Sequence, residues 1–255
     1  MFMSKKLSVV IITKNEEENI RYCLESVKWA DEIIIVDGYS KDRTIEICEE
    51  YTDKIFQYEQ SNFAEAKNYG IEKSSGEWIL SIDADEIVTY ELQKEILKLI
   101  SNNENNLVGY FIPRKNYFLG KWIKYCGWYP DFQLRLFKKD KGKFIKREVH
   151  ERLRIEGNSG FLKSNILHHT YKSIFDYFYR FNRYTYLEAN EMIKNGKKFR
   201  SYKVLFYPIA LFIYMYFLRR GFMDGMHGFL LSVFSSFYEF IKYVKLWELE
   251  KKQYN

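Results

Sequence analysis

Two carboxylates that follow an apolar segment are the side chains of this sequence best suited to chemistry. Asp83 and Asp85, separated by Ala84, come directly after the strand-like run 78–82. Carboxylate oxygens are preferred ligands of Mg²⁺ and Mn²⁺, and a cation held by one or two of them keeps positions for phosphate oxygens. Such a cation stabilises a departing diphosphate, so the pair predicts metal-assisted transfer from a nucleotide diphosphate. A solvated turn is the structural alternative.

Polar side chains also follow the two strand-like runs that come earlier in the chain. Thr13 ends the run 7–13, and we expect it to contact a nucleotide base or ribose; Asn15 after it is equally suited to capping a helix. Asp37 follows the run 32–36, where a carboxylate can accept hydrogen bonds from a base imide or a ribose hydroxyl. A plain strand-to-helix turn is the alternative for Asp37.

Alternating strand and helix patterns indicate the fold that must position these residues. Near-continuous apolar strands separated by helices predict an α/β fold with a mostly parallel sheet covered by helices on both faces. Ligands bind beyond the carboxyl ends of the strands in such sheets. We expect strands at 7–13, 32–36, 54–57 and 77–82, helices at 16–29, 42–51, 63–74 and 89–100, and a surface loop at 101–106.

The middle of the chain predicts an acceptor site. Strand-like segments at 109–116 and 132–137 bracket an aromatic, glycine-containing loop at 118–130, which is suited to stacking on a sugar. Gln133 and Arg135 alternate with apolar residues and therefore share one side of their strand. Arg135 either reaches the diphosphate or balances a neighbouring acid.

The last third of the chain changes to long aromatic helices, expected at 173–195, 202–218 and 228–249. The uncharged run 204–218 has about 15 residues, fewer than the about 20 that span a bilayer, so we expect an interfacial or re-entrant helix. Lysines and arginines at its ends fit an anionic membrane surface. A buried helical hairpin or a homo-oligomer interface is the alternative.

Composition excludes several classes of protein. With 255 residues, 47% hydrophobic and 19% aromatic, the chain is not disordered. The net charge of +6 is dispersed among acids, which argues against nucleic-acid binding. Three cysteines without metal-ligand spacing predict neither a disulfide framework nor a zinc site and suit a reducing cytoplasm. Residues 1–6 show no export signal, so we expect a cytoplasmic protein.

Three segments, VIITKNEEENI, IIIVDGYSKDRT and NFAEAKNYGIEKSSGEWILSIDADE, resemble the inverting family 2 glycosyltransferases, which have the GT-A fold. GWYPDFQLRLFKK, REVHERL and RRGFMDGMHGF resemble the narrower bacterial subgroup of lipopolysaccharide-core β-glucosyltransferases. The resemblance implies a GT-A Rossmann-like catalytic domain over 1–170, with a nucleotide-sugar half at 1–106 and an acceptor half at 107–170. A helical region at 171–255 would contact the cytoplasmic face of the inner membrane.

The resemblance also assigns roles to individual residues. It implies that Thr13, Glu16 and Asp37 hold the base and ribose of a UDP-sugar donor, without the second acid that many relatives have at Gly38. It places Asp83 and Asp85 at the site of Mg²⁺ or Mn²⁺. Lys67 either approaches the nucleotide or is a solvated helix lysine. His150 is a further candidate for the metal or the diphosphate.

An inverting transfer needs a base that takes the proton of the acceptor hydroxyl. We expect Asp131, after the aromatic loop, to be this base; Glu148 and Glu151 are the alternatives, each also suited to a structural salt bridge. The predicted reaction moves a hexose, most simply glucose, onto a lipid-linked saccharide. A capsule, teichoic acid or protein-linked glycan is the alternative acceptor, and a non-catalytic nucleotide-sugar-binding scaffold is the rival from another class.

Overall fold

A computed structural model describes residues 6–59, 63–101, 106–145 and 152–254. The chain forms two compact units, one of residues 1–114 with 131–168 and one of residues 115–130 with 169–255. The aromatic loop at 118–130 groups with the C-terminal helices in the second of these units.

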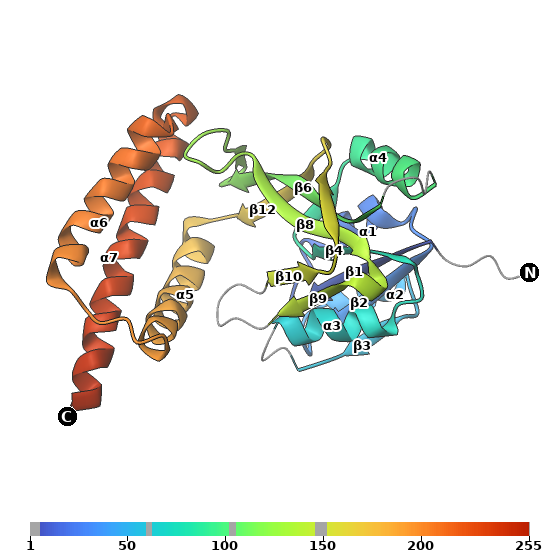
Figure 1. Ribbon diagram of the computed structural model, residues 1–255, viewed down its shortest axis with the longest axis horizontal. Helices are drawn as coiled ribbons and strands as arrows, with labels where there is room; N and C mark the ends of the chain where they lie inside the picture. Colours follow the sequence, from blue (N-terminus) through green and yellow to red (C-terminus); the bar gives the residue numbers. More distant parts are fainter. Residues whose placement is uncertain (1–5, 60–62, 102–105, 146–151, 255) are drawn as a thin grey trace, which may run out of the picture. The chain divides into compact units, whose positions relative to one another are not determined.

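Four parallel strands form one half of the sheet in the first unit (Figure 1), in the order β3-β2-β1-β4. Their runs of β-branched and leucine side chains are buried on both faces because helices cover both sides. The apolar residues of α1 and α4 pack with one face and those of α3 with the other. The elements are β1 (Leu7–Thr13), α1 (Ile20–Val27), β2 (Glu32–Asp37), α2 (Thr44–Glu49), β3 (Ile55–Gln57), α3 (Phe63–Lys73), β4 (Trp78–Asp83) and α4 (Tyr90–Ser101).

The other half of the sheet is largely antiparallel, so the sheet is mixed. Strand β8 (Asp131–Lys138) lies antiparallel to both β4 and β6 (Leu107–Phe118). The order continues through β12 (Ile166–Tyr171) to β5 (Glu86–Val88), while β11 (Asn158–Phe161) and β7 (Lys121–Trp122) pair with β6. Strands β9 (Gly142–Ile145) and β10 (Arg152–Ile155) form a separate hairpin.

Helices make up most of the second unit. They are α5 (Ile174–Lys194), α6 (Ser201–Ile213) with a π-helical turn (Tyr214–Leu218), a 3₁₀ turn (Gly221–Asp224) and α7 (Met226–Tyr254). Phe118 packs with Tyr177, Phe181 and Leu231 in the core of this unit.

The segment RRGFMDGMHGF has a structural role in the second unit. The buried carboxylate of Asp224 accepts hydrogen bonds from the backbone N–H groups of Tyr125 (2.8 Å) and Lys124 (3.3 Å). A Cβ on Gly228 would lie 1.9 Å from the carbonyl oxygen of Gly221, so the two backbones approach closely only because residue 228 is glycine. The segment therefore anchors the aromatic loop.

The first helix starts later than expected, at Ile20 instead of residue 16. Asn15 does not cap it. This residue has φ 55°, and its side-chain oxygen accepts a hydrogen bond from the backbone N–H of Lys41 (2.8 Å). Asn15 thus joins the loop after β1 to the loop after β2.

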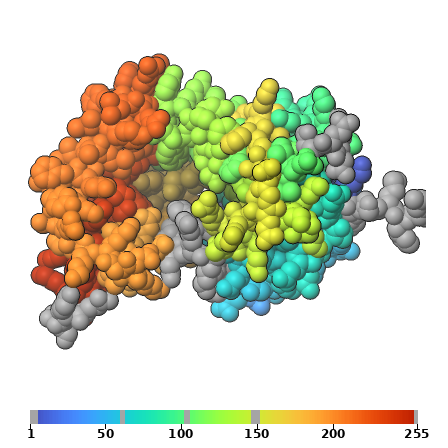
Figure 2. Space-filling model, in the orientation of Figure 1, coloured from blue at the N-terminus to red at the C-terminus, as the bar shows by residue number. Residues whose placement is uncertain are grey.

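The segment Ser201–Leu218 is an 18-residue apolar helix, long enough by length and composition to cross a membrane, and only 6% of it is buried. It is longer than the uncharged run 204–218 because the helix begins before that run, at Ser201. Figure 2 shows α6, in orange, on the visible face of the second unit. This low burial contradicts the alternative of a helical hairpin buried within the chain.

Candidate functional site

The carboxyl ends of β1, β2 and β4 bring three predicted residues to one edge of the sheet. Thr13 is the register partner of Asp37, and Ile12 is the partner of Asp83. The buried carboxylate of Asp37 accepts hydrogen bonds from the backbone N–H (2.8 Å) and the hydroxyl (2.5 Å) of Ser40. Asp37 therefore orders the loop after β2 in the arrangement seen here.

Glu16 lies in the loop that leads from β1 to α1. Its backbone N–H donates to the hydroxyl of Thr44 (2.8 Å), and its carboxylate accepts from the side-chain amide of Asn19 (2.6 Å). The residues predicted to hold the nucleoside thus lie at the ends of β1 and β2 and in the loop after β1, and hydrogen bonds connect this loop to the segment after β2.

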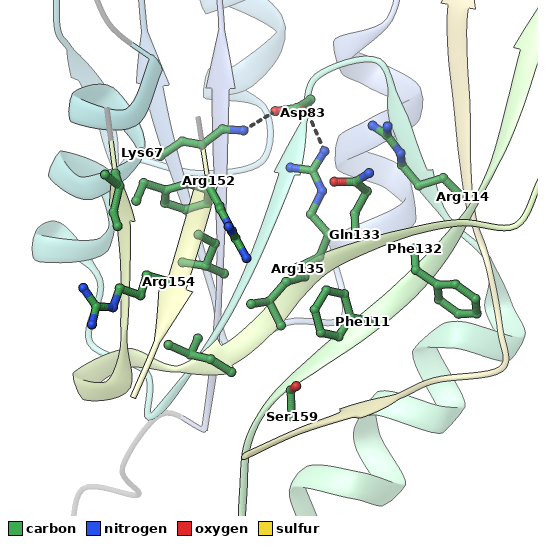
Figure 3. A pocket seen from close by; sticks show the side chains of 15 residues that line it. Lys67, Asp83, Phe111, Arg114, Phe132, Gln133, Arg135, Arg152, Arg154 and Ser159 are labelled. Atoms are coloured by element: carbon green, nitrogen blue, oxygen red, sulfur yellow. Dashed lines mark hydrogen bonds and ion pairs between the residues drawn. The ribbon is translucent and has the colours of Figure 1, made fainter. Parts of the chain in front are cut away.

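Asp83 lies between two cationic side chains (Figure 3). Lys67 Nζ is 2.9 Å from one carboxylate oxygen, and Arg135 Nη2 is 2.6 Å from the other. Burial would raise the pKa of Asp83, but the charges of Arg135 and Lys67 outweigh burial and hold this pKa well below its usual value. The carboxylate is therefore ionised at neutral pH.

Lys67 is only 1% exposed, so the interpretation as a solvated helix lysine is wrong. Its ammonium group also lies 5.2 Å from the centre of the Phe144 ring. A buried lysine needs a counter-charge, and Asp83 supplies it.

Sequence reasoning missed Glu86, whose side chain is fully buried. It accepts hydrogen bonds from Arg135 (2.8 Å), from Arg114 (3.1 Å) and from the backbone N–H of Asp83 (2.9 Å). Glu86 follows Asp85 directly, and this continuation of the acidic run was the only signal for it in the sequence. Arg135 therefore balances two acids, as one of the two interpretations of its position predicted.

Asp131 is held by two side chains of the same half of the sheet. Arg114 donates to one of its oxygens through Nη2 (2.6 Å) and Nε (2.9 Å), and Gln133 donates to the other (2.6 Å). Arg114 connects Asp131 to Glu86, so Lys67, Asp83, Arg135, Glu86, Arg114 and Asp131 form one alternating chain of cations and anions.

Asp83 and Asp85, the predicted metal ligands, contact basic side chains in this structure. Both oxygens of Asp83 contact cations, and a carboxylate oxygen of Asp85 lies 3.5 Å from His168 Nε2. In the described ranges, no group of three or more His, Cys, Asp or Glu side chains is placed to hold a metal. The candidates Glu148, His150 and Glu151 lie outside the described residues.

A cavity of about 910 Å³ opens beside Asp83, which matches the roughly 300–1,000 Å³ typical of small-molecule sites. Its lining includes five basic side chains and one acid, Asp83; Thr13, Glu16 and Asp37 are not among the lining residues. Arg152 points its guanidinium group into the cavity and forms no ion pair or hydrogen bond with a described residue (Figure 3). The basic residues are Lys67, Arg114, Arg135, Arg152 and Arg154.

Comparison with known proteins shows which family this chain is similar to. Residues 8–170 match the model of Glycosyl transferase family 2. The lipopolysaccharide core biosynthesis glycosyltransferase LpsC of Rhizobium meliloti is 30% identical over 254 residues, which cover 95% of this chain and 92% of LpsC. An uncharacterised glycosyltransferase of Rickettsia typhi is 30% identical over 262 residues, covering 98% of this chain and 90% of that protein.

Among solved structures, the mannosyltransferase PcManGT of Pyrobaculum calidifontis, in complex with GDP-Man and Mn²⁺, has a similar fold. The TM-score is 0.55 at 14% sequence identity, over 96% of this chain and 88% of PcManGT. At this identity the likeness supports the GT-A fold alone.

Proposed function

Because the chain belongs to glycosyl transferase family 2, we propose that it moves a hexose, most simply glucose, from a UDP-sugar to a lipid-linked saccharide such as lipopolysaccharide core. The observation that carries this proposal is the cavity beside Asp83, whose lining has five basic side chains and a single acid. A diphosphate brings negative charge, and a desolvated cationic cavity stabilises it. Lipopolysaccharide core is proposed as the acceptor because LpsC is named as a lipopolysaccharide core biosynthesis glycosyltransferase.

Two groups of residues would hold the donor. Thr13, Glu16 and Asp37 would contact the base and ribose at the edge of the sheet, which requires Asp37 to exchange a hydrogen bond of Ser40 for one to the nucleoside. Lys67 and Arg135 would lie at the diphosphate, and Arg152 would add positive charge that no described acid balances.

Asp131 is proposed as the base. It would take the proton of the acceptor hydroxyl while the hydroxyl oxygen attacks the anomeric carbon and the bond from that carbon to the diphosphate breaks. This single displacement inverts the anomeric configuration and needs no covalent intermediate. Arg114 and Gln133 orient the carboxylate for this step.

The proposal includes a requirement for Mg²⁺ or Mn²⁺, with Asp83 and Asp85 as the metal ligands. A cation at this position would further stabilise the negative charge of the diphosphate. Since Lys67 and Arg135 occupy the oxygens of Asp83, the metal would compete with them.

We also propose that the second unit contacts the cytoplasmic face of the inner membrane through α6. Leu205, Phe206 and Ile209 on this helix are each more than half exposed, and the uncharged run 204–218 is flanked by Arg200, Lys203, Arg219 and Arg220. Apolar residues bordered by cations bind the interface of an anionic bilayer. A homo-oligomer that covers the same face is the alternative.

The substitution Asp131→Asn tests the proposal that Asp131 is the catalytic base. We expect UDP release from UDP-glucose in the presence of truncated lipopolysaccharide to fall at least about 100-fold, because a positioned base contributes roughly 10²–10⁴-fold. UDP binding should be unchanged, and Asp140→Asn, a change of an exposed aspartate in the same unit, should have no effect.

Full activity of Asp131→Asn would refute the assignment of Asp131 as the catalytic base. A wild-type protein that binds UDP but releases none from any UDP-sugar, with lipopolysaccharide, teichoic acid or capsular acceptors alike, would favour the scaffold instead.

A further inference from the structure

Three phenylalanines form an exposed aromatic cluster in the first unit. The rings of Phe111 and Phe161 stack with centroids 5.1 Å apart at 20°, and Phe132 meets Phe161 edge to face at 5.1 Å and 85°. Phe161 is 64% exposed and Phe132 is 39% exposed. We call Phe111, Phe132 and Phe161 the phenylalanine platform. Exposed apolar clusters of this kind mark binding sites more often than isolated exposed residues do.

The strands hold the platform in a fixed geometry. Phe161 on β11 is the register partner of Phe111 on β6. A Cβ on Gly160 would lie 2.9 Å from Leu107 Cδ1 and 3.1 Å from Tyr110 Cε1, so glycine allows β11 to lie close against β6. Phe111 covers one face of the Phe161 ring and Phe132 contacts this ring edge to face, yet Phe161 stays 64% exposed, which leaves room for a ligand.

The platform is continuous with the cavity beside Asp83. Phe111 and Phe132 are lining residues of the cavity, as is Ser159, two positions before Phe161 on the same strand. Figure 3 shows Phe111 between Arg135 and Ser159. A ligand on the platform therefore lies at the wall of the proposed donor site.

We propose that the phenylalanine platform is the subsite for a pyranose ring of the acceptor; this inference rests on the proposed function. A pyranose presents C–H groups on its faces and hydroxyl groups around its rim. A flat aromatic ring accommodates the apolar face of the sugar. The Ser159 hydroxyl and the Arg152 guanidinium, which belong to the same cavity, could form hydrogen bonds with the hydroxyl groups at the rim of the sugar. This site lies on the sheet of the first unit, not on the aromatic loop at 118–130 that the sequence suggested.

A second copy of the chain or a membrane fits the platform less well. Stable protein interfaces bury about 800 Å² per partner, far more than three rings provide. The cavity residues next to the platform include Arg114, Arg152 and Ser159, whose polar groups favour a small polar ligand over lipid tails.

Saturation-transfer NMR of the full chain with methyl glucopyranoside, methyl galactopyranoside and methyl mannopyranoside, in the presence of UDP, tests the proposal. We expect at least one pyranoside to receive saturation at ring C–H protons. In Phe161→Ala the affinity should fall by roughly 3- to 10-fold, as expected for loss of one aromatic contact. Phe161→Trp should retain binding. Tyr22→Ala is the matched control, because Tyr22 is 65% exposed in the same unit, and it should behave as wild type.

Unchanged pyranoside binding in Phe161→Ala, or no saturation transfer to any pyranoside in the wild type, would overturn the subsite. Loss of self-association in Phe161→Ala by sedimentation, without pyranoside binding, would assign the platform to a second copy instead. If the pyranosides bind through Phe161 but no UDP is released from any UDP-sugar, the proposed transferase activity fails and the sugar site stands.

Discussion

Lys67→Met gives a direct measure of the ion pair at the centre of the site. The substitution keeps most of the apolar stem and removes the ammonium group that lies 2.9 Å from Asp83. Breaking a fully buried ion pair costs about 3–5 kcal/mol. The Asp83 side chain is 30% exposed and keeps Arg135 at 2.6 Å, so a smaller loss is expected. We predict that the free energy of unfolding falls by about 2 kcal/mol at pH 7.

The loss should depend on pH in a defined direction. Burial raises the pKa of Asp83, but Arg135 and Lys67 lower it further, so its pKa in the folded protein lies below that in the unfolded chain, which is about 3.9. A group of this kind stabilises the fold above the unfolded pKa, and its contribution disappears as the pH falls through the folded pKa. The difference between wild type and Lys67→Met should therefore be full near pH 7 and shrink as the pH falls through the folded pKa of Asp83, first in the variant, whose carboxylate keeps only Arg135.

Urea unfolding at a series of pH values measures both quantities. Lys73→Met is the matched control, because Lys73 is an exposed lysine of the same helix whose ammonium group lies over the Tyr69 ring at 5.2 Å. It should cost less than about 0.5 kcal/mol. Equal effects of the two substitutions at pH 7, or a loss in Lys67→Met that grows as the pH falls, would contradict the reasoning.

Three further outcomes follow from the contacts described. If Asp83 is a metal ligand, Lys67→Met should bind Mn²⁺ more tightly than wild type by electron paramagnetic resonance, and Asp83→Asn more weakly; affinities that do not change would remove Asp83 from the metal site. Asp224→Ala should lower the free energy of unfolding by about 1–3 kcal/mol, because it leaves two part-buried backbone N–H groups without their acceptor, whereas the exposed Glu248→Ala should be near neutral in the same urea assay. Leu205→Glu should reduce co-sedimentation with anionic liposomes, and equal sedimentation of variant and wild type would argue against membrane contact by this face of α6.

The parallel half of the sheet could be predicted because each strand carries its own signal. The runs that became β1, β2 and β4 are apolar and continuous, and each ends at a polar residue, so local sequence places Asp37 and Asp83 at one edge. The GT-A fold was confirmed for this reason. The antiparallel strands were harder: β8 inserts between β4 and β6, and no local pattern states which strands a segment will pair with.

The partners of the site residues could not be predicted, since they come from distant parts of the chain. The sequence left a solvated Lys67 open because its counter-ion, Asp83, lies on another element, and it did not point to Glu86 because the cations of Glu86 are Arg114 and Arg135. Asp224 reaches back about a hundred residues to the loop it anchors. Periodicity describes which face of an element is apolar, but it contains no information on which charges meet after folding.

The charge balance of the site separates residues that position groups from residues that can neutralise a substrate. The ion-pair chain contains three cations, Lys67, Arg135 and Arg114, and three anions, Asp83, Glu86 and Asp131. This chain has no net charge, so it fixes the carboxylates in place but offers a diphosphate little net attraction. The excess positive charge of the cavity comes from β10, where neither Arg152 nor Arg154 pairs with a described residue. Figure 3 shows the guanidinium group of Arg152 directed toward Arg135 and that of Arg154 directed away from Asp83, so Arg152 is the residue of β10 placed to meet a diphosphate beside the balanced chain.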